Sequence, residues 1–174
     1  NFVGPDFETR MNLNWIKGSE VTSLDTANNQ VILADGRTVE YDKLCICTGS
    51  HPNFFPIPGL REGKNITGFR DFCDVAFIEE RLADVQNIFV MGAGLVGIDV
   101  LAGLVPFNKN LTLCDMGPYM LPIQLDEYSA GVYGRMFEEK GVKQYYNMGA
   151  KEFALNEEGN CYKVILNDGT EIPT

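Results

Sequence analysis

A glycine-rich hexapeptide near the middle of the chain is the feature that points most directly to chemistry. It has the G-x-G-x-x-G spacing of dinucleotide-binding turns and reads Gly92-Ala93-Gly94-Leu95-Val96-Gly97. In such a turn the first glycine allows a sharp bend, the second lets the backbone approach a pyrophosphate, and the third lets a helix pack closely on a sheet. The helix N-terminus behind the turn adds unpaired N–H groups and the positive end of a dipole. We therefore expect a pyrophosphate to bind at Gly92, Gly94, Leu95, Val96 and Gly97.

An acidic residue follows at the position that suits the adjoining ribose. The hexapeptide lies between an apolar strand predicted at 87–91 and a helix predicted at 96–105, and the next buried strand, at 111–114, runs into Asp115. A carboxylate there accepts a hydrogen bond from a ribose 2′-hydroxyl and repels a 2′-phosphate. The four residues after Asp115 contain no arginine that could bind such a phosphate. The pattern therefore predicts NADH rather than NADPH as the ligand.

The elements around these residues alternate as they do in a parallel α/β sheet. A second strand-helix-strand step follows the first, because Asp126 can cap a helix that runs to about Lys140 and residues 142–146 form another strand. Two more strands, at 151–155 and 162–166, are separated by a polar turn. We predict an α/β fold with a Rossmann-like NAD-binding domain, built of βαβ units and an appended β meander.

The first half of the chain has the pattern of a separate β meander and a stiff connector. Strands are predicted at 18–24 and 30–33, and a third strand ends in residues 41–47, which Thr48-Gly49-Ser50 closes. A non-helical connector follows because prolines stand at 52, 56 and 58. A helix is then predicted at 74–84, where apolar residues recur at helical spacing.

The strongly acidic composition limits the classes of partner. With a net charge of −10, the chain is a poor ligand for nucleic acid or for an anionic membrane surface. Residues 88–107 are apolar apart from Asp99 and have the length of a membrane span, but a carboxylate near the bilayer centre and several glycines argue against one. No secretory signal pattern stands at the start. We expect no nucleic-acid or membrane partner and a cytoplasmic location.

The cysteines give no sign of a metal site or a disulfide framework. Five of them are scattered along the chain, without the close paired spacing of zinc ligands or of a secreted scaffold, at 45, 47, 73, 114 and 161. We predict reduced, mostly buried thiols and no metal. Cys45 and Cys47 share one face of the predicted strand, where a bridge between them would distort the backbone.

Several further motifs, in a fixed order, give the chain a family resemblance. Residues 41–52 resemble a strand that ends in an A-T-G-S-x-P motif, with Cys47 where alanine is usual. The connector motif Pro56-Ile57-Pro58-Gly59, the pairs Leu121-Pro122 and Leu125-Asp126, and the stretch 168–173 also fit. The sequence thus resembles the pyridine nucleotide-disulfide oxidoreductase superfamily, in particular its NADH-dependent branch of rubredoxin reductases, NADH oxidases and nitrite reductase flavoprotein subunits.

That resemblance implies a chain with parts of two domains. In the family an NAD domain interrupts an FAD domain, so residues 1–64 would be a partial FAD-domain segment and residues 65–174 the NAD(H)-binding domain. Thr48, Gly49 and Ser50 would line the FAD side in the parent protein. The family's N-terminal FAD glycine motif and its late Gly-Asp motif are not found here. We therefore expect FAD in the full-length parent and no retention of FAD by this fragment.

The resemblance also bears on Asp99 and on the only histidine. Asp99 stands two residues after Gly97, where the family commonly has a glutamate that faces the nicotinamide. The resemblance gives Asp99 a role in orienting the nicotinamide, although aspartate is one methylene shorter; the alternative is a simple acid on the helix surface. His51 is expected to be a loop residue rather than a proton donor.

Together these expectations describe the NADH side of a flavoprotein oxidoreductase. The parent would transfer hydride from NADH to FAD and on to an unidentified acceptor, with the remaining FAD-domain segments as partners, while the fragment alone would bind NADH weakly and catalyse nothing. One alternative is a non-catalytic dinucleotide-binding or sensing module, and another is an NADPH-dependent member of the family. A third is a scaffold with a purely structural glycine turn, in which other atoms would fill the space in front of Gly94.

Overall fold

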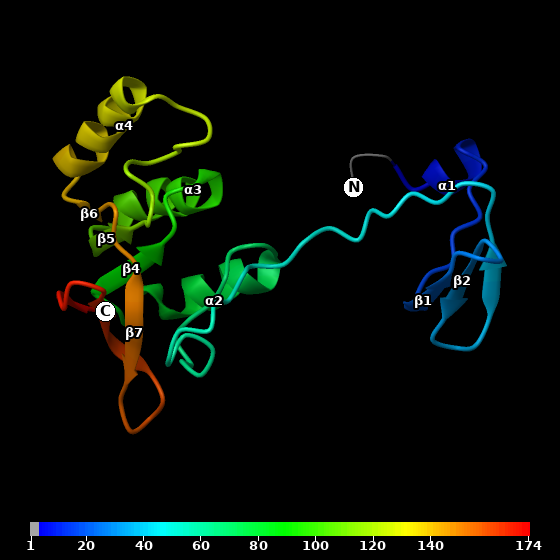
Figure 1. Ribbon diagram of the computed structural model, residues 1–174, viewed down its shortest axis with the longest axis horizontal. Coiled ribbons are helices and arrows are strands. Elements are labelled where there is room, and N and C mark those ends of the chain that lie inside the picture. The colour runs from blue at the N-terminus through cyan, green and yellow to red at the C-terminus, as the bar shows by residue number, and fades with distance from the viewer. Residues whose placement is uncertain (1–3) are drawn as a thin grey trace. The chain divides into compact units, whose positions relative to one another are not determined.

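A computed structural model describes residues 4–174 of the chain, and residues 1–3 lie outside it. The chain divides into two compact units, with the boundary between Gly49 and Ser50 (Figure 1). No helix of the described residues is long and apolar enough to cross a membrane.

The first unit contains a short helix and a three-stranded antiparallel sheet. Helix α1 (Phe7–Arg10) precedes strands β1 (Val21–Asp25), β2 (Gln30–Leu33) and β3 (Thr38–Glu40), which pair in sequence order. The single tryptophan, Trp15, lies in this unit with 58% of its surface exposed, and the Lys17 ammonium lies 4.3 Å from its ring centroid.

The strand predicted at 41–47 is not formed, and this prediction was wrong. Strand β3 ends at Glu40, and none of the described residues from 42 to 54 takes part in a backbone–backbone hydrogen bond. A strand is stable only where a neighbour satisfies its N–H and C=O groups, and no described strand lies beside this segment. Cys45 and Cys47 are consequently exposed, with their Sγ atoms 3.3 Å apart. Cys73 is exposed as well, so the prediction of mostly buried thiols was wrong.

The second unit is built on a parallel sheet. Helix α2 (Phe72–Leu82) leads into β4 (Asn87–Met91), α3 (Leu95–Leu104), a short 3-10 turn η1 (Val105–Phe107), β5 (Asn110–Cys114), α4 (Glu127–Glu139) and β6 (Lys143–Tyr145). The sheet order is β4-β5-β6, with both pairs parallel. These are the two predicted βαβ steps, and the Asp126 carboxylate caps α4 as expected by accepting the Ser129 N–H at 2.8 Å.

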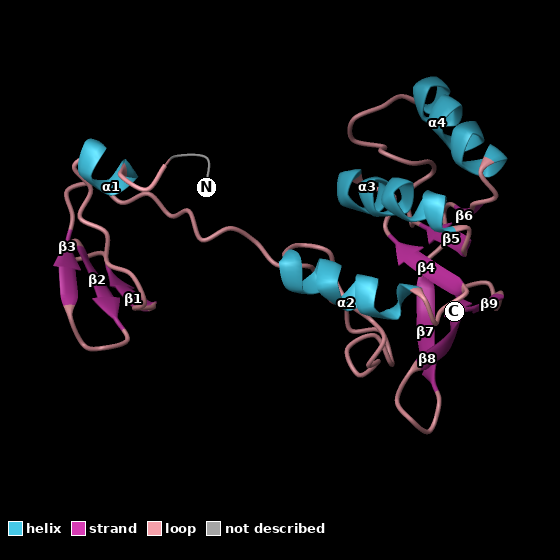
Figure 2. Ribbon diagram, turned by 180° about the vertical axis from the view of Figure 1, so that it is seen from behind, coloured by secondary structure: helices cyan, strands magenta, loops and turns pink. Residues whose placement is uncertain are grey.

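A second sheet follows as the predicted meander. Strands β7 (Ala150–Leu155), β8 (Cys161–Leu166) and β9 (Glu171–Pro173) pair antiparallel in sequence order (Figure 2). The parallel strands lie between two hydrophobic clusters, since alternate side chains of a strand point to opposite faces. Val90 and Leu113 pack with α3 and α4 in one cluster, and Phe89 and Cys114 pack with the meander in the other. The α/β fold class is therefore confirmed.

The connector before α2 packs on the meander. Pro58 accepts a backbone hydrogen bond from Phe153, and the Asn65 side chain both accepts from Cys161 N at 2.7 Å and donates to Cys161 O at 2.8 Å. Leu60, 4% exposed, is part of the same cluster as Phe153. The segment from about Pro58 to Ile66 is thus an integral part of the second unit.

Candidate dinucleotide site

The glycine hexapeptide forms the turn between β4 and α3. Gly92, directly after β4, has a φ of +110°, a backbone conformation that side chains strongly disfavour. Helix α3 begins at Leu95 with Gly94 as its N-cap, and no side chain caps it. The first N–H groups of the helix are therefore free to meet a ligand rather than a capping side chain.

Gly97 is held against the backbone of the turn. A Cβ added at Gly97 would lie 1.9 Å from the carbonyl oxygen of Gly92. Real Cβ atoms do not approach backbone so closely, so neither the helix nor the turn could keep its position with a larger residue. Only glycine fits here, for the reason that the spacing predicts.

Gly94 faces open space. Its φ of −78° is one that any residue can adopt, and a Cβ added there would meet no atom within 4 Å. The neighbouring Leu95 and Val96 are 59% and 53% exposed. No described atom therefore fills the space in front of Gly94, whereas the scaffold alternative requires that space to be filled.

The Asp115 carboxylate reaches the glycine turn from the end of β5. Its Oδ2 accepts the Ala93 N–H at 2.6 Å, and its Oδ1 accepts the Gly117 N–H at 2.5 Å. The structure thus brings Asp115 together with the predicted pyrophosphate residues. Sequence reasoning did not single out Ala93 or Gly117, although the Asp-x-Gly pattern at 115–117 is typical of a turn that a side chain stabilises.

A second hydrogen bond holds the other side of the Ala93 residue. Leu121 donates its N–H to the Ala93 carbonyl at 2.8 Å, and Ala93 is fully buried. Leu121 has a φ of +53°, which is rare for a residue that is not glycine, asparagine or aspartate. The segment after β5 therefore makes two hydrogen bonds to the centre of the glycine turn.

Buried Cys114 and half-buried Tyr146, both beside Asp115, stay protonated to high pH. Burial, with the Asp115 and Asp168 carboxylates acting in the same direction, raises the pKa of Cys114 to about 11. Burial, followed by the Asp115 charge, raises the pKa of Tyr146 to about 12. Neither group carries a charge near neutral pH.

The remaining predicted site residues lie outside this constellation. Asp99 is exposed on α3, and no hydrogen bond or ion pair with any described residue reaches its carboxylate. Thr48 and Gly49 belong to the first unit, and Ser50 begins the second. His51 is exposed, with its Nδ1 3.2 Å from the Pro52 carbonyl oxygen. Ser50 and His51 nevertheless line the same cavity as Gly92 and Gly94.

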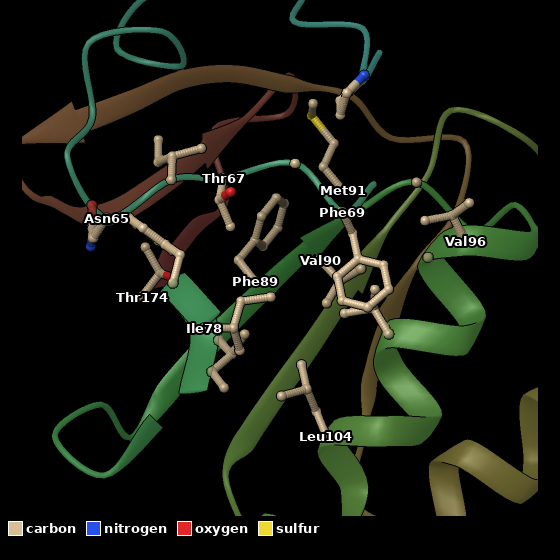
Figure 3. Close-up of a pocket in the computed structure, with 18 of the residues that line it drawn as sticks. Asn65, Thr67, Phe69, Ile78, Phe89, Val90, Met91, Val96, Leu104 and Thr174 are labelled. Carbon is tan, nitrogen blue, oxygen red and sulfur yellow. The ribbon is translucent and has the colours of Figure 1, made fainter. Parts of the chain in front are cut away.

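A large, mainly apolar cavity of about 900 Å³ adjoins the glycine turn. Gly92, Gly94 and Val96 line one part of it, and Figure 3 shows Phe69, Ile78 and Phe89 pointing into it. All residues of strand β4 line the cavity, and within the described residues β4 pairs only with β5. The turn thus lies at one end of an open apolar cavity along the edge of the sheet.

Comparison with known proteins assigns the family. Residues 7–174 match the family model described as pyridine nucleotide-disulphide oxidoreductase. The chain belongs to this family. The putidaredoxin reductase of Pseudomonas putida is 28% identical over 172 residues, which are 97% of this chain and 41% of that protein. An NADH oxidase of Enterococcus faecalis is 32% identical over 74% of this chain and 28% of its own length.

Solved structures agree in fold over almost the whole chain. The reductase in a covalent putidaredoxin reductase–putidaredoxin complex superposes with a TM-score of 0.87 at 26% identity, covering 98% of this chain and 42% of that one. An NADH-bound, water-forming NADH oxidase from Lactobacillus brevis has the same fold, with a TM-score of 0.85 at 20% identity over 98% of this chain and 38% of that one. The chain therefore spans about two fifths of these relatives.

Proposed function

We propose that the chain supplies the NADH-binding part of an FAD-dependent oxidoreductase. In this proposal α3 and its glycine turn bind the pyrophosphate, Asp115 binds the adenosine ribose, and Asp99 lies toward the nicotinamide. Residues 65–174 would form the NAD(H) domain, and residues 1–64, with Thr48, Gly49 and Ser50, would belong to the FAD side of the parent. Bound FAD would accept the hydride, while the protein groups bind and orient the nucleotide.

The contrast between two glycines carries the proposal. Gly97 must be glycine because a methyl group would strike the Gly92 carbonyl, whereas Gly94 has no such neighbour and an ordinary φ. A glycine with no internal reason to be glycine, at the N-terminus of an uncapped helix, is explained by a ligand that comes close to its backbone.

Asp115 supports NADH over NADPH. Its carboxylate would repel a 2′-phosphate, and the residues that follow it, 116–119, offer no cation. The acceptor after FAD lies outside the proposal, because the relatives' names range from reductases of ferredoxin-type proteins to NADH oxidase and nitrite reductase.

Calorimetric titration with NADH, and separately with NADPH, tests the proposal on the purified chain and two variants. We expect wild type to prefer NADH, and Gly94→Ala to fold normally but lose about tenfold or more in affinity, because its methyl group occupies the space of the pyrophosphate. Gly103→Ala is the matched control: it lies in the same helix, also faces open space, and is far from the turn. It should bind NADH like wild type.

Two results would contradict the proposal. Equal affinity of wild type and Gly94→Ala would mean that nothing approaches Gly94, and absence of NADH binding at millimolar concentration would remove the site from this chain. Equal binding of NADH and NADPH would refute only the part assigned to Asp115.

A further inference from the structure

The Asp115 carboxylate has two backbone partners before any ligand arrives. It accepts the N–H of Ala93, which lies 22 residues earlier in the glycine turn, and the N–H of Gly117, two residues later in its own turn. The carboxylate thus joins the glycine turn to the turn after β5. Hydrogen bonds to an ionised carboxylate are stronger than neutral ones. We call this three-residue arrangement the Asp115 bridge.

The bridge acts on Ala93, whose N–H and carbonyl oxygen are both hydrogen-bonded to the segment after β5. The Ala93 N–H is taken by Asp115 and its carbonyl by the N–H of Leu121. Leu121 keeps a left-handed backbone conformation to do so, and such strain persists only where the surroundings impose it. Gly92 and Gly94, on either side of Ala93, are the glycines proposed to meet the pyrophosphate.

We propose that Asp115 is a positioning residue for the phosphate site as well as a ligand for the ribose. This inference rests on the proposed dinucleotide function and deepens it. Asp115 holds the Ala93 backbone in place by accepting its N–H. The position of Ala93 sets the direction in which Gly94 and the first N–H groups of α3 point. The pyrophosphate therefore binds to a turn that is already formed. Removing the carboxylate therefore weakens binding of phosphate groups that Asp115 itself never touches.

The bridge predicts a result that a ribose contact alone does not. 2′,3′-Dideoxyadenosine diphosphate carries the two phosphates but lacks both hydroxyl groups that Asp115 could bind. If Asp115 acted on the ribose alone, Asp115→Ala would leave the affinity for this compound unchanged, or raise it because a negative charge near the phosphates is gone. With the bridge, Asp115→Ala weakens the dideoxy compound and ADP alike, each by about fivefold or more.

A measurement without ligand separates this inference from the proposed function. Amide hydrogen exchange of the full chain, followed by NMR, should show slow exchange of the Ala93 and Gly117 N–H groups, and about tenfold or faster exchange in Asp115→Ala. The Leu113 amide, in the buried strand β5, reports whether the variant is folded. Asp115→Asn is the milder variant, since its amide can accept from only one of the two N–H groups and should release the other.

Asp126→Asn is the matched control. It alters a carboxylate that also accepts a backbone N–H, at the start of α4 and outside the bridge. It should leave the exchange of Ala93 and Gly117 unchanged. Unchanged exchange in both Asp115 variants would overturn the bridge, and so would undiminished affinity of Asp115→Ala for the dideoxy compound when ADP binding falls. Altered exchange in a chain that binds no nucleotide would support the bridge and refute the proposed function.

Discussion

Two glycines of the hexapeptide have a structural reason to be glycine, and the third does not. Gly92 has a left-handed φ, Gly97 has no room for a Cβ, and Gly94 has room that no part of the described chain uses. The spacing alone predicts these three roles. It could not predict that Ala93, an unremarkable position in the pattern, is the residue that the Asp115 carboxylate holds, because that contact depends on how two strand ends meet.

Gly97→Ala should destabilise the second unit. The new methyl group would lie 1.9 Å from a backbone oxygen, which cannot rotate away as a side chain could. We expect a loss of about 1–3 kcal/mol in the free energy of unfolding, measured by urea titration followed by circular dichroism. Gly103→Ala should instead gain up to about 1 kcal/mol, because alanine is the better helix former. A Gly97→Ala protein as stable as wild type would show that the close contact is absent.

Stability should fall in alkali because of Cys114. Its pKa rises from 9.0 to about 11 on folding, so between these values the unfolded chain loses the proton that the folded chain keeps. The free energy of unfolding should therefore drop as pH rises from 9 to 11, by about 2 kcal/mol at most from this group. Cys114→Ser should show a shallower drop than wild type over the same pH range. Equal slopes for wild type and Cys114→Ser would refute the assignment.

At the scale of elements, regular patterns were predicted well and one segment was not. Strand β4, the two helices that follow it and the meander lie within a few residues of their predicted positions, because apolar periodicity and caps such as Asp126 are local signals. The predicted strand at 41–47 ends in four apolar residues, 44–47, but has no described neighbour to pair with. Apolar periodicity indicates which side chains a segment would bury. It does not indicate whether a neighbouring strand is present to pair with that segment.

The Asn65 side chain is one of the contacts that attach the connector before α2 to the meander. Asn65 makes both a donated and an accepted hydrogen bond to the backbone of Cys161, as a strand neighbour would. Asn65→Ala should cost about 1–3 kcal/mol in the free energy of unfolding, because it leaves two backbone groups unpaired. Asn53→Ala removes an exposed amide that makes no hydrogen bond with any described residue, and it should be neutral. A neutral Asn65→Ala would show that the connector is held by Leu60 and its apolar neighbours alone.

For the whole molecule, the division into two units bears on the predicted domain boundary. The boundary at residue 64 remains a prediction about the parent protein. Within this chain, the contacts of Pro58 and Asn65 with the meander assign the connector to the second unit, and the change between units falls near Gly49. Three prolines predict the connector from the sequence. The contacts that attach it to the meander involve residues almost a hundred positions later, so the sequence pattern does not show them.

Limited trypsin digestion should cut first after Lys43, near the end of the first unit. Lys43 lies in the segment that makes no backbone hydrogen bonds, whereas Lys64 donates its N–H to the Gly159 carbonyl and its ammonium to the Glu158 carbonyl. A protease needs an extended, detachable backbone, so mass spectrometry should find cleavage after Lys43 well before cleavage after Lys64. Simultaneous cleavage at both sites would mean that the connector is as loosely held as the segment before it.

The position of Trp15 determines what tryptophan fluorescence can report about this protein. The only indole of the chain lies in the first unit and is largely exposed, next to a lysine. Its emission reports on the surroundings of residue 15 in that unit. A fluorescence melting curve could therefore look unperturbed while the nucleotide site is already lost, and quenching by an added nucleotide would not identify where that nucleotide is bound. A tryptophan introduced into the second unit would give that unit an indole signal of its own.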